Sequence, residues 1–323
     1  MSPEQNNKKP LVSFIIPACN VPTDMLRECI GSIQQLSLRR FEREVIVVDD
    51  GSDESPLAAL ADCRDDIIYL RQRNQGVAVA RNTGLLLAQG DFIQFVDADD
   101  LLVSAPYEHV LDLVRYGKAD MVMFDFCEQP DNKTIYNDEP PRAGATLLRS
   151  QNIHGSACGF IFSRSILGSL RFTPGIAYGE DEEFTPQLLL RAERVITTTA
   201  RAYHYRQRPG SAINRTDMRS RLRRLSDARE VLMSLHAKSD TMPPEERVAM
   251  QRRTAQLTMD YIYNVIVLTQ SRHYLDRQLD LLGKAGLFPL PDRDYTTKYT
   301  WFRRMTNSSV GRTLLIRTLP LIK

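Results

Sequence analysis

Two short runs of apolar residues, each followed at once by a group of aspartates, most restrict the fold of this 323-residue chain. Residues 44–48 lead into the sequence DDGS at 49–52, and residues 92–96 lead into DADD at 97–100. Mostly apolar runs of this length are typical of strands that are buried on both faces. The sequence therefore predicts a covered, parallel sheet with acidic groups at the ends of its strands.

Other segments extend this pattern. An apolar run at 11–17 is followed by Thr23, a suitable N-cap, and then by apolar residues at helical spacing. Strand and helix alternate along the chain, which predicts an α/β fold with a mostly parallel sheet and helices on both faces. The expected strands are 11–17, 44–48, 92–96, 120–126, 157–162 and 194–202, and the expected helices are 23–36, 77–89, 105–116 and 181–192.

The second half of the chain has a different character. Residues 128–146 are polar and rich in proline, which indicates a loop, and no strand is expected after residue 215. Helices are expected at 216–237, 244–270 and 272–284. The predicted organisation is a polar tail (1–10), a catalytic domain (11–215, with halves 11–127 and 128–215), a helical region (216–294) and a basic amphipathic tail (295–323).

Composition excludes several classes of protein. Lys and Arg total 42 against 40 Asp and Glu, so the net charge gives no general attraction to nucleic acid. The five cysteines are scattered without CxxC spacing, which argues against disulfides and a zinc knuckle and favours a reducing compartment. The N-terminus lacks the apolar region of a signal peptide, and no run approaches the ~18 apolar residues of a membrane span. A cytoplasmic protein is expected, with peripheral contact to the cytoplasmic membrane as an option.

The aspartate groups indicate a particular chemistry. Ligands of open α/β sheets bind at the carboxyl ends of the strands, so 49–50 and 97–100 are expected to face one crevice. Carboxylates gathered there repel one another unless a cation offsets them. Oxygen ligands select Mg²⁺ or Mn²⁺, which takes substrate phosphates as further ligands. The prediction is a metal-bridged diphosphate site; the alternative is that these residues only cap turns and helices.

The motifs resemble those of a known family. LVSFIIPACN, EVIVVDDGSDE and NQGVAVARNTGLLLAQGDFIQFVDADD, over residues 11–102, are similar to the nucleotide-sugar half of the family-2 glycosyltransferases, which have the GT-A fold. Residues 179–181 (GED) and 203–211 (YHYRQRPGS) resemble later motifs of that family. The resemblance covers roughly residues 11–215 and implies a GT-A fold, Rossmann-like in its mostly parallel central sheet.

The resemblance implies a donor site. Pro17, Ala18 and Asn20 would line the nucleotide base, and Asp50 would accept a hydrogen bond from it. A carboxylate suits a uracil-type N–H donor, so UDP is the favoured nucleotide. Asp49 belongs to the same motif, with a purely turn-forming role as the alternative.

The resemblance also implies a metal site. Asp97 and Asp99 occupy the positions of the DxD motif, with Asp99 on the metal and Asp97 on the metal or the ribose. Asp100 is an alternative ligand, because the register within a run of acids is ambiguous. His204 is a further candidate ligand, or else a packed histidine. The expected ion is Mn²⁺ or Mg²⁺.

Asp181 resembles the catalytic base of the family. Members invert the anomeric carbon in one displacement, so a base must lie on the acceptor side. An aspartate at a helix N-terminus stays ionised because the helix dipole favours its charged form. Glu180 is the rival, Glu182 and Glu183 are remoter alternatives, and an acidic first helical turn without catalytic role is the other interpretation.

Three arginines are candidates for the diphosphate. Arg206 and Arg208 are suited to neutralise it as it leaves, with a solvated basic loop as the alternative. Arg81, in the sequence ARNTG, serves either the diphosphate or the acidic strand ends.

The last segment, 295–323, holds six Lys or Arg and no acidic residue, interleaved with aromatic and aliphatic side chains. This composition is typical of a helix on an anionic membrane. The alternative is a helix that docks its apolar face on the catalytic domain.

These observations predict a metal-dependent, inverting glycosyltransferase that moves a sugar from a nucleoside-diphosphate sugar to a glycan or lipid-linked glycan in surface polysaccharide synthesis. A nucleotidyltransferase acting on a sugar phosphate and a non-catalytic binding protein are the alternatives. Nucleic-acid binding is disfavoured, because the arginine-rich residues 206–224 form no recognisable module.

Overall fold

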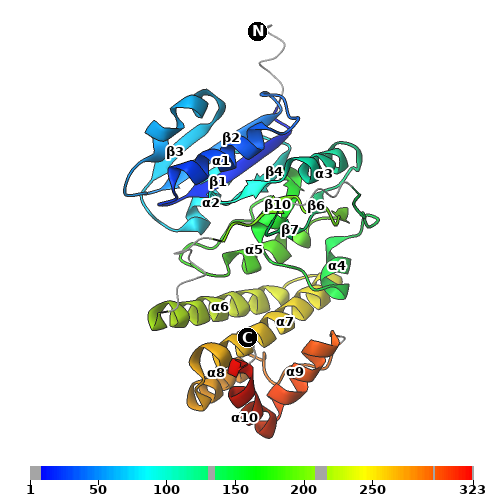
Figure 1. Cartoon of the computed structure of the whole chain (residues 1–323). Coiled ribbons are helices and arrows are strands. Elements are labelled where there is room, and N and C mark those ends of the chain that lie inside the picture. The colour runs from blue at the N-terminus through cyan, green and yellow to red at the C-terminus, as the bar shows by residue number, and fades with distance from the viewer. Residues whose placement is uncertain (1–8, 130–134, 208–216, 294, 322–323) are drawn as a thin grey trace. The chain divides into compact units, whose positions relative to one another are not determined.

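A computed structural model of the protein describes residues 9–129, 135–207, 217–293 and 295–321 (Figure 1). The chain divides into two compact units. The first contains Met1–Leu147 and His154–Ser211, and the second contains Leu148–Ile153 and Ala212–Lys323. The first is a sheet with helices, and the second is helical (Figure 1).

A seven-stranded sheet forms the centre of the first unit. Its order is β3-β2-β1-β4-β8-β6-β9, and only β8 runs antiparallel to its neighbours among the described strands. This confirms the expected α/β fold with a mostly parallel sheet. The bounds are β1 (Val12–Ala18), β2 (Arg43–Asp50), β3 (Ile68–Gln72), β4 (Phe92–Phe95), β6 (Met121–Met123), β8 (Phe160–Ser163) and β9 (Val195–Thr197).

The central strands form because their apolar runs are buried completely. In β1, Phe14, Ile15 and Ile16 have no exposed surface, and Ile15 is paired with Ile46 of β2 and Phe95 of β4. β3 was not expected from the sequence, because it lies at the sheet edge and its residues alternate between half-buried and exposed.

The predicted helices of this unit are present within a few residues: α1 (Thr23–Gln34), α2 (Val77–Leu87), α3 (Ser104–Tyr116) and α5 (Glu180–Leu189). Two further elements were not expected. Residues Pro56–Asp66 form a 3₁₀ segment, and α4 (Gly144–Ser150) lies at the end of the polar stretch predicted as a loop. α4 is anchored by the buried side chains of Leu147 and Leu148.

A second, three-stranded sheet explains where the strand predictions were wrong. It consists of β5 (Leu101–Leu102), β10 (Tyr203–His204) and β7 (Phe126–Cys127), in that order. The run at 120–126 is divided because β6 belongs to the large sheet and β7 to the small one. The run at 194–202 ends at β9, and the chain then enters β10. The run at 157–162 becomes a strand only at Phe160, after a 3₁₀ turn capped by Ser156.

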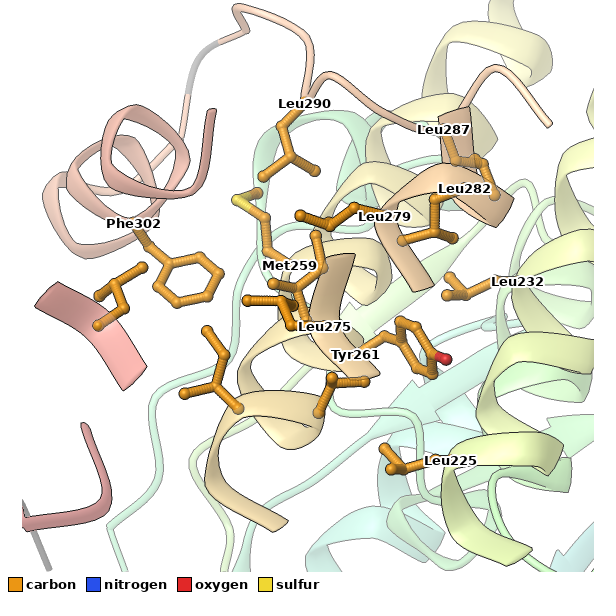
Figure 2. Packing of buried hydrophobic residues seen from close by; sticks show 14 of the residues in the cluster. Leu225, Leu232, Met259, Tyr261, Leu275, Leu279, Leu282, Leu287, Leu290 and Phe302 are labelled. Carbon is orange, nitrogen blue, oxygen red and sulfur yellow. The ribbon is translucent and has the colours of Figure 1, made fainter. Parts of the chain in front are cut away.

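The second unit contains five long helices, namely α6 (Met218–Ser239), α7 (Pro244–Thr269), α8 (Arg272–Lys284), α9 (Thr297–Asn307) and α10 (Ser309–Thr318). They share one hydrophobic core, in which Leu232, Tyr261, Leu275 and Phe302 come from four different helices (Figure 2). Within the described residues no helix is long and apolar enough to span a membrane.

The basic tail is folded into this second unit. Phe302 of α9 and Leu315 of α10 belong to its core, and Tyr299 and Ile316 pack against it. The apolar face of the tail is therefore docked on its own helical unit. The remaining large apolar side chains of these two helices, including Trp301 and Leu314, stay exposed.

Gly84 sets how closely α2 approaches β1, and α2 carries Arg81. A Cβ atom at Gly84 would lie 2.2 Å from Cγ2 of Ile15. We expect Gly84→Ala to destabilise the protein by ~1–3 kcal/mol through overpacking. Gly31→Ala is the matched control, because a Cβ there meets nothing within 4 Å and alanine favours a helix. Urea unfolding measures the free energy of unfolding of both variants. Equal stability of the two variants would contradict the close packing of α2 on β1.

Candidate active site

The two groups of aspartates lie at adjacent strand ends, as the sequence predicts. β1 lies between β2 and β4 and is parallel to both. Asp49 and Asp50 end β2, and Asp97–Asp100 follow β4. The fold thus gathers these carboxylates on either side of the end of β1.

Asp49 holds the turn after β2. One of its oxygens accepts a hydrogen bond from Ser52 N (2.9 Å) and the other from the Tyr69 hydroxyl (2.7 Å), and Arg71 Nε lies at 3.4 Å. Burial acts to raise the pKa of Asp49, but these hydrogen bonds and Arg71 outweigh it, so the pKa is lowered. These contacts favour the turn-forming role of Asp49.

Asp50 fixes the start of α2. Its Oδ1 accepts hydrogen bonds from Gln72 Nε2 (2.8 Å) and Gln75 N (2.9 Å), and its Oδ2 accepts one from Gly76 N (2.8 Å). Gly76 has φ +91°, a conformation that glycine adopts readily. A carboxylate has about four acceptor sites, so three of those of the buried Asp50 are used within the fold.

The expected base-binding residues lie at the end of β1. Ala18 is buried, Pro17 is half-buried and Asn20 is exposed. Asn20 connects its loop to the DDGS turn. Its backbone N–H donates to Ser52 Oγ (3.0 Å), and its side-chain Oδ1 accepts from Asp53 N (2.8 Å). The loop after β1 and the turn after β2 therefore form one continuous rim.

The four residues after β4 have different environments. The Asp97 side chain is 38% exposed and Asp99 is half-buried, whereas Asp100 is 1% exposed. Asp100 accepts hydrogen bonds from the Tyr203 hydroxyl (2.9 Å) and Arg206 N (2.8 Å). Burial, together with the charge of Asp97, raises the pKa of Asp100 to about 7. Asp100 thus holds the turn, and Asp97 and Asp99 are less deeply buried than Asp100.

Asp97 and Asp99 fit a divalent cation of the Mg²⁺ type, which needs only one or two carboxylates when phosphates and water complete its shell. Within the part of the chain that the structure describes, no three His, Cys, Asp or Glu side chains are grouped closely enough to hold a metal. A cation here would therefore depend on oxygens of the substrate.

His204 follows Tyr203 in β10 and is paired with Leu101 of β5. Its Nε2 is hydrogen-bonded to the Glu128 carbonyl (2.9 Å). Because side chains alternate along a strand, Tyr203 points toward Asp97 and Asp100 and His204 points the other way. The structure does not bring His204 together with Asp97 and Asp99.

Arg81 of α2 connects the two sides of the site. Its Nη2 contacts Asp97 Oδ1 (3.1 Å), and its Nη1 contacts Glu180 Oε1 (2.8 Å) and Asp181 Oδ1 (2.5 Å). Its side chain is 3% exposed. Of the two roles expected for Arg81, these contacts favour support of the acidic groups.

Asp181 and Glu180 begin α5, after Gly179 in a left-handed conformation. Asp181 Oδ2 accepts a hydrogen bond from Ala157 N (3.0 Å), so both of its oxygens are oriented. Burial and then the charge of Asp181 raise the pKa of Glu180 to about 8, while Arg81 opposes this. The raised pKa favours the protonated form of Glu180 more than in an ordinary glutamate, which favours Asp181 as the base.

Arg206 holds loops together. Its guanidinium donates to the carbonyls of Asp99 and Met25 and to the Glu28 carboxylate. Arg206 therefore supports the Asp99 turn in this structure. Arg208 lies outside the described residues.

Sequence reasoning missed two supporting groups. The buried Tyr203 accepts a hydrogen bond from Asp97 N (3.0 Å) in addition to donating to Asp100. Phe172 and Phe184 stack with ring centres 3.9 Å apart, and Phe172 also packs on the Arg81 guanidinium. Tyr203 lies in the YHYR motif, but nothing in the sequence indicates that Phe172 reaches Arg81.

Comparison with known proteins identifies the domain. Residues 13–170 match the model of the family described as Glycosyl transferase family 2. This segment includes both aspartate groups and Arg81. The chain therefore carries a family-2 glycosyltransferase domain, and the resemblance predicted from the motifs is confirmed.

Relatives and solved structures agree with this. The uncharacterized glycosyltransferase EpsJ of Bacillus subtilis is 31% identical over 218 residues, 62% of this chain and 62% of that protein. The crystal structure of S. aureus TarS 1-349 in complex with UDP-GlcNAc has a TM-score of 0.68 at 18% identity, covering 96% of this chain and 90% of that one. The mannosyltransferase PcManGT from Pyrobaculum calidifontis, in complex with GDP-Man and Mn²⁺, has a TM-score of 0.55 at 18% identity, covering 98% and 88%. These structures confirm the GT-A fold.

The alignments with curated relatives are partial. They span 62% of EpsJ, and 38% of the glycosyltransferase GlyA of Streptococcus pneumoniae, which is 26% identical over 275 residues and 77% of this chain. The chain thus covers less than two thirds of these relatives.

The environment of Glu180 gives a testable pH effect. The folded protein holds the Glu180 proton up to about pH 8, whereas an ordinary glutamate loses it near pH 4.5, so wild-type stability falls as pH rises through this window. Glu180→Gln has no such proton, so its melting temperature should exceed that of the wild type by several degrees at pH 8 and by less toward pH 5. Thermal unfolding between pH 5 and 8 measures this. The exposed Glu193→Gln is the control; a pH-independent difference for Glu180→Gln would contradict the raised pKa.

Proposed function

We propose that this protein is a metal-dependent, inverting glycosyltransferase. It moves a sugar from a nucleoside-diphosphate sugar to a hydroxyl of a glycan or lipid-linked glycan in cell-surface polysaccharide synthesis. The observation that carries the proposal is the pairing of Arg81 with both Asp97 and Asp181. It places an accessible carboxylate at the strand ends beside a second one suited to act as a base.

The donor side is assigned to the strand ends. Asp97 and Asp99 would hold Mn²⁺ or Mg²⁺, which when bound neutralises the diphosphate and so makes it a better leaving group. The rim formed by Pro17, Ala18 and Asn20 would take the nucleotide base. Arg206 supports Asp99 from behind through its carbonyl.

The transfer step is a single displacement. Asp181 accepts the proton of the acceptor hydroxyl as that oxygen forms a bond to C1 of the sugar. The bond from C1 to the phosphate oxygen breaks on the opposite face, and its electron pair leaves with the nucleoside diphosphate. Ala157 N and Arg81 hold one Asp181 oxygen each, which fixes the carboxylate during this step.

UDP is the favoured nucleotide. As an acceptor, the carboxylate of Asp50 suits the N–H group of uracil. TarS, a similar structure, was solved with UDP-GlcNAc, whereas PcManGT was solved with GDP-Man. The choice between these nucleotides is the first part of the proposal to test.

Nucleotide binding should need both the metal and Asp99. In calorimetric titrations, UDP should bind the wild type at micromolar concentration with Mn²⁺ and lose at least tenfold in affinity with EDTA or in Asp99→Ala. Asp91→Ala, an exposed aspartate just before β4, is the control and should bind as the wild type does. Equal affinity for UDP, GDP and CDP would contradict the assignment of UDP as the nucleotide. Absence of any nucleotide binding would contradict the proposed activity.

Transfer should depend on Asp181 rather than on Glu180. With a donor found by screening UDP-sugars for UDP release, Asp181→Asn should lower kcat by ~10²–10⁴-fold, the usual contribution of a general base. Glu180→Gln should cost less than about tenfold, because the raised pKa of Glu180 favours its protonated form. Release of pyrophosphate in place of UDP would instead indicate a nucleotidyltransferase.

A peripheral membrane contact through residues 295–323 is part of the proposal. In α10, Val310, Leu314 and Arg317 are exposed at a spacing of four and three residues, so they share one face of the helix. In α9, Trp301 is exposed together with Arg304, three residues on. Exposed apolar groups beside cations, without acidic residues in the segment, suit the surface of an anionic membrane.

Binding to vesicles tests this contact. Each cation near such a surface contributes ~1 kcal/mol, so Arg304→Glu/Arg317→Glu should weaken binding to phosphatidylglycerol-containing vesicles by at least tenfold. Lys284→Glu, on α8, is the control. Sedimentation with vesicles measures the binding. Equal binding to neutral phosphatidylcholine vesicles, or no effect of the double change, would contradict a role of the tail cations.

A further inference from the structure

We infer that Arg81 is a positioning residue that couples the donor side of the site to the proposed base. This inference rests on the proposed function. It assigns to Arg81 two tasks, the orientation of Asp181 and the sharing of its positive charge between Asp181 and Asp97. Neither task involves contact with the nucleotide.

The geometry of the guanidinium supports the first task. Asp97 comes from the end of β4 and Asp181 from the start of α5, so these two carboxylates approach each other only through the tertiary fold. Arg81 uses separate nitrogens for them, Nη2 for Asp97 and Nη1 for Asp181. A guanidinium has fixed donor directions, whereas a lysine ammonium is a point charge on a flexible stem. Arginine therefore fixes the relative position of both carboxylates.

The position of Arg81 is itself fixed by neighbouring aromatic rings. The guanidinium carbon lies 5.3 Å from the ring centre of Phe172 and 5.9 Å from that of Phe95. Phe172 stacks on Phe184, which lies on α5 one helical turn after Glu180. The ring stack thus joins Arg81 to the helix that carries the proposed base.

The next residue in the chain strengthens this support. Asn82 Nδ2 donates to the carbonyl of Phe172 (2.8 Å), and Asn82 Oδ1 accepts from the Phe172 amide (2.9 Å). Two successive residues of α2 therefore hold the carboxylates and the backbone of Phe172, whose ring packs on the Arg81 guanidinium. This arrangement gives the ARN sequence a physical role inside the domain.

The charge balance supports the second task. Three carboxyl groups face one guanidinium, and Glu180 is the most deeply buried of them. Arg81 contacts Asp97 through Nη2 and the two acidic residues of α5 through Nη1, so its single charge is shared between the two sides. If Asp97 turns toward a cation on the diphosphate, Arg81 retains only its partners on α5. Donor binding then changes the environment of the base without any movement of α5.

The variants separate positioning from a general structural role. Arg81→Lys keeps the positive charge but loses the fixed donor directions of the guanidinium, and Arg81→Gln loses the charge as well. For Arg81→Lys we expect kcat to fall by about 10²-fold, as for a displacement of ~1 Å in a reacting group, with the donor KM within threefold of the wild type. Arg27→Lys, in the exposed pair with Asp62, is the matched control and should not change kcat.

Mn²⁺ binding in the presence of UDP, measured by calorimetry, supplies a readout besides activity. Removing a cation beside Asp97 should leave the Mn²⁺ affinity of Arg81→Gln unchanged or increased. A merely structural role predicts the opposite, namely a lower Mn²⁺ affinity together with the lower kcat. If Arg81→Gln does not fold, the changes in kcat and donor KM of Arg81→Lys distinguish a positioning role from a structural one.

The outcomes distinguish this inference from the proposed function. Transfer by the wild type with kcat unchanged in Arg81→Lys would overturn the inference alone. A lower kcat together with a higher donor KM and a lower metal affinity would also overturn the inference, because this combination indicates a structural role. Absence of both UDP binding and transfer in the wild type would overturn the proposed function and the inference with it.

Discussion

Repulsion between carboxylates is the constraint on which the arrangement of this domain depends. The parallel sheet brings acidic groups to the ends of β2 and β4, and α5 adds Glu180 and Asp181. Arg81, deeply buried, offsets the charge at Asp97 and α5. Backbone amides and the side chains of Tyr69, Gln72 and Tyr203 donate hydrogen bonds to Asp49, Asp50 and Asp100. Without these partners, so many carboxylates at one edge of a sheet would repel one another strongly.

The same contacts separate supporting from accessible groups. Asp49 and Asp100 use both of their oxygens within the fold, and Asp50 uses three of its acceptor positions there. Asp97, by contrast, keeps more than a third of its side chain exposed. A run of aspartates in the sequence therefore contains two kinds of residue, namely buried ones that hold the loops and more exposed ones. In this family-2 glycosyltransferase domain, this division shapes the proposed donor site.

The sequence was sufficient for the fold class, the principal helices and the family, because buried strands and their aspartates are local patterns. It was insufficient where tertiary contacts decide. The run at 120–126 serves two sheets, and β3 lacks a strong apolar pattern because it lies at an edge. The hydrogen bond between Tyr203 and Asp100 and the contact of Phe172 with Arg81 each connect residues about 90 or more positions apart. No local sequence pattern encodes such contacts.

The central claim is that a diphosphate lies beside a metal held by Asp97 and Asp99. Phosphorus NMR of UDP tests it directly, because Mn²⁺ strongly accelerates the relaxation of nearby phosphorus nuclei. We expect the wild-type protein to increase the relaxation of both UDP phosphates in the presence of Mn²⁺, beyond the effect of Mn²⁺ alone. We expect Asp99→Ala to abolish this increase. An equal effect in the wild type and in Asp99→Ala would contradict the assignment of the site.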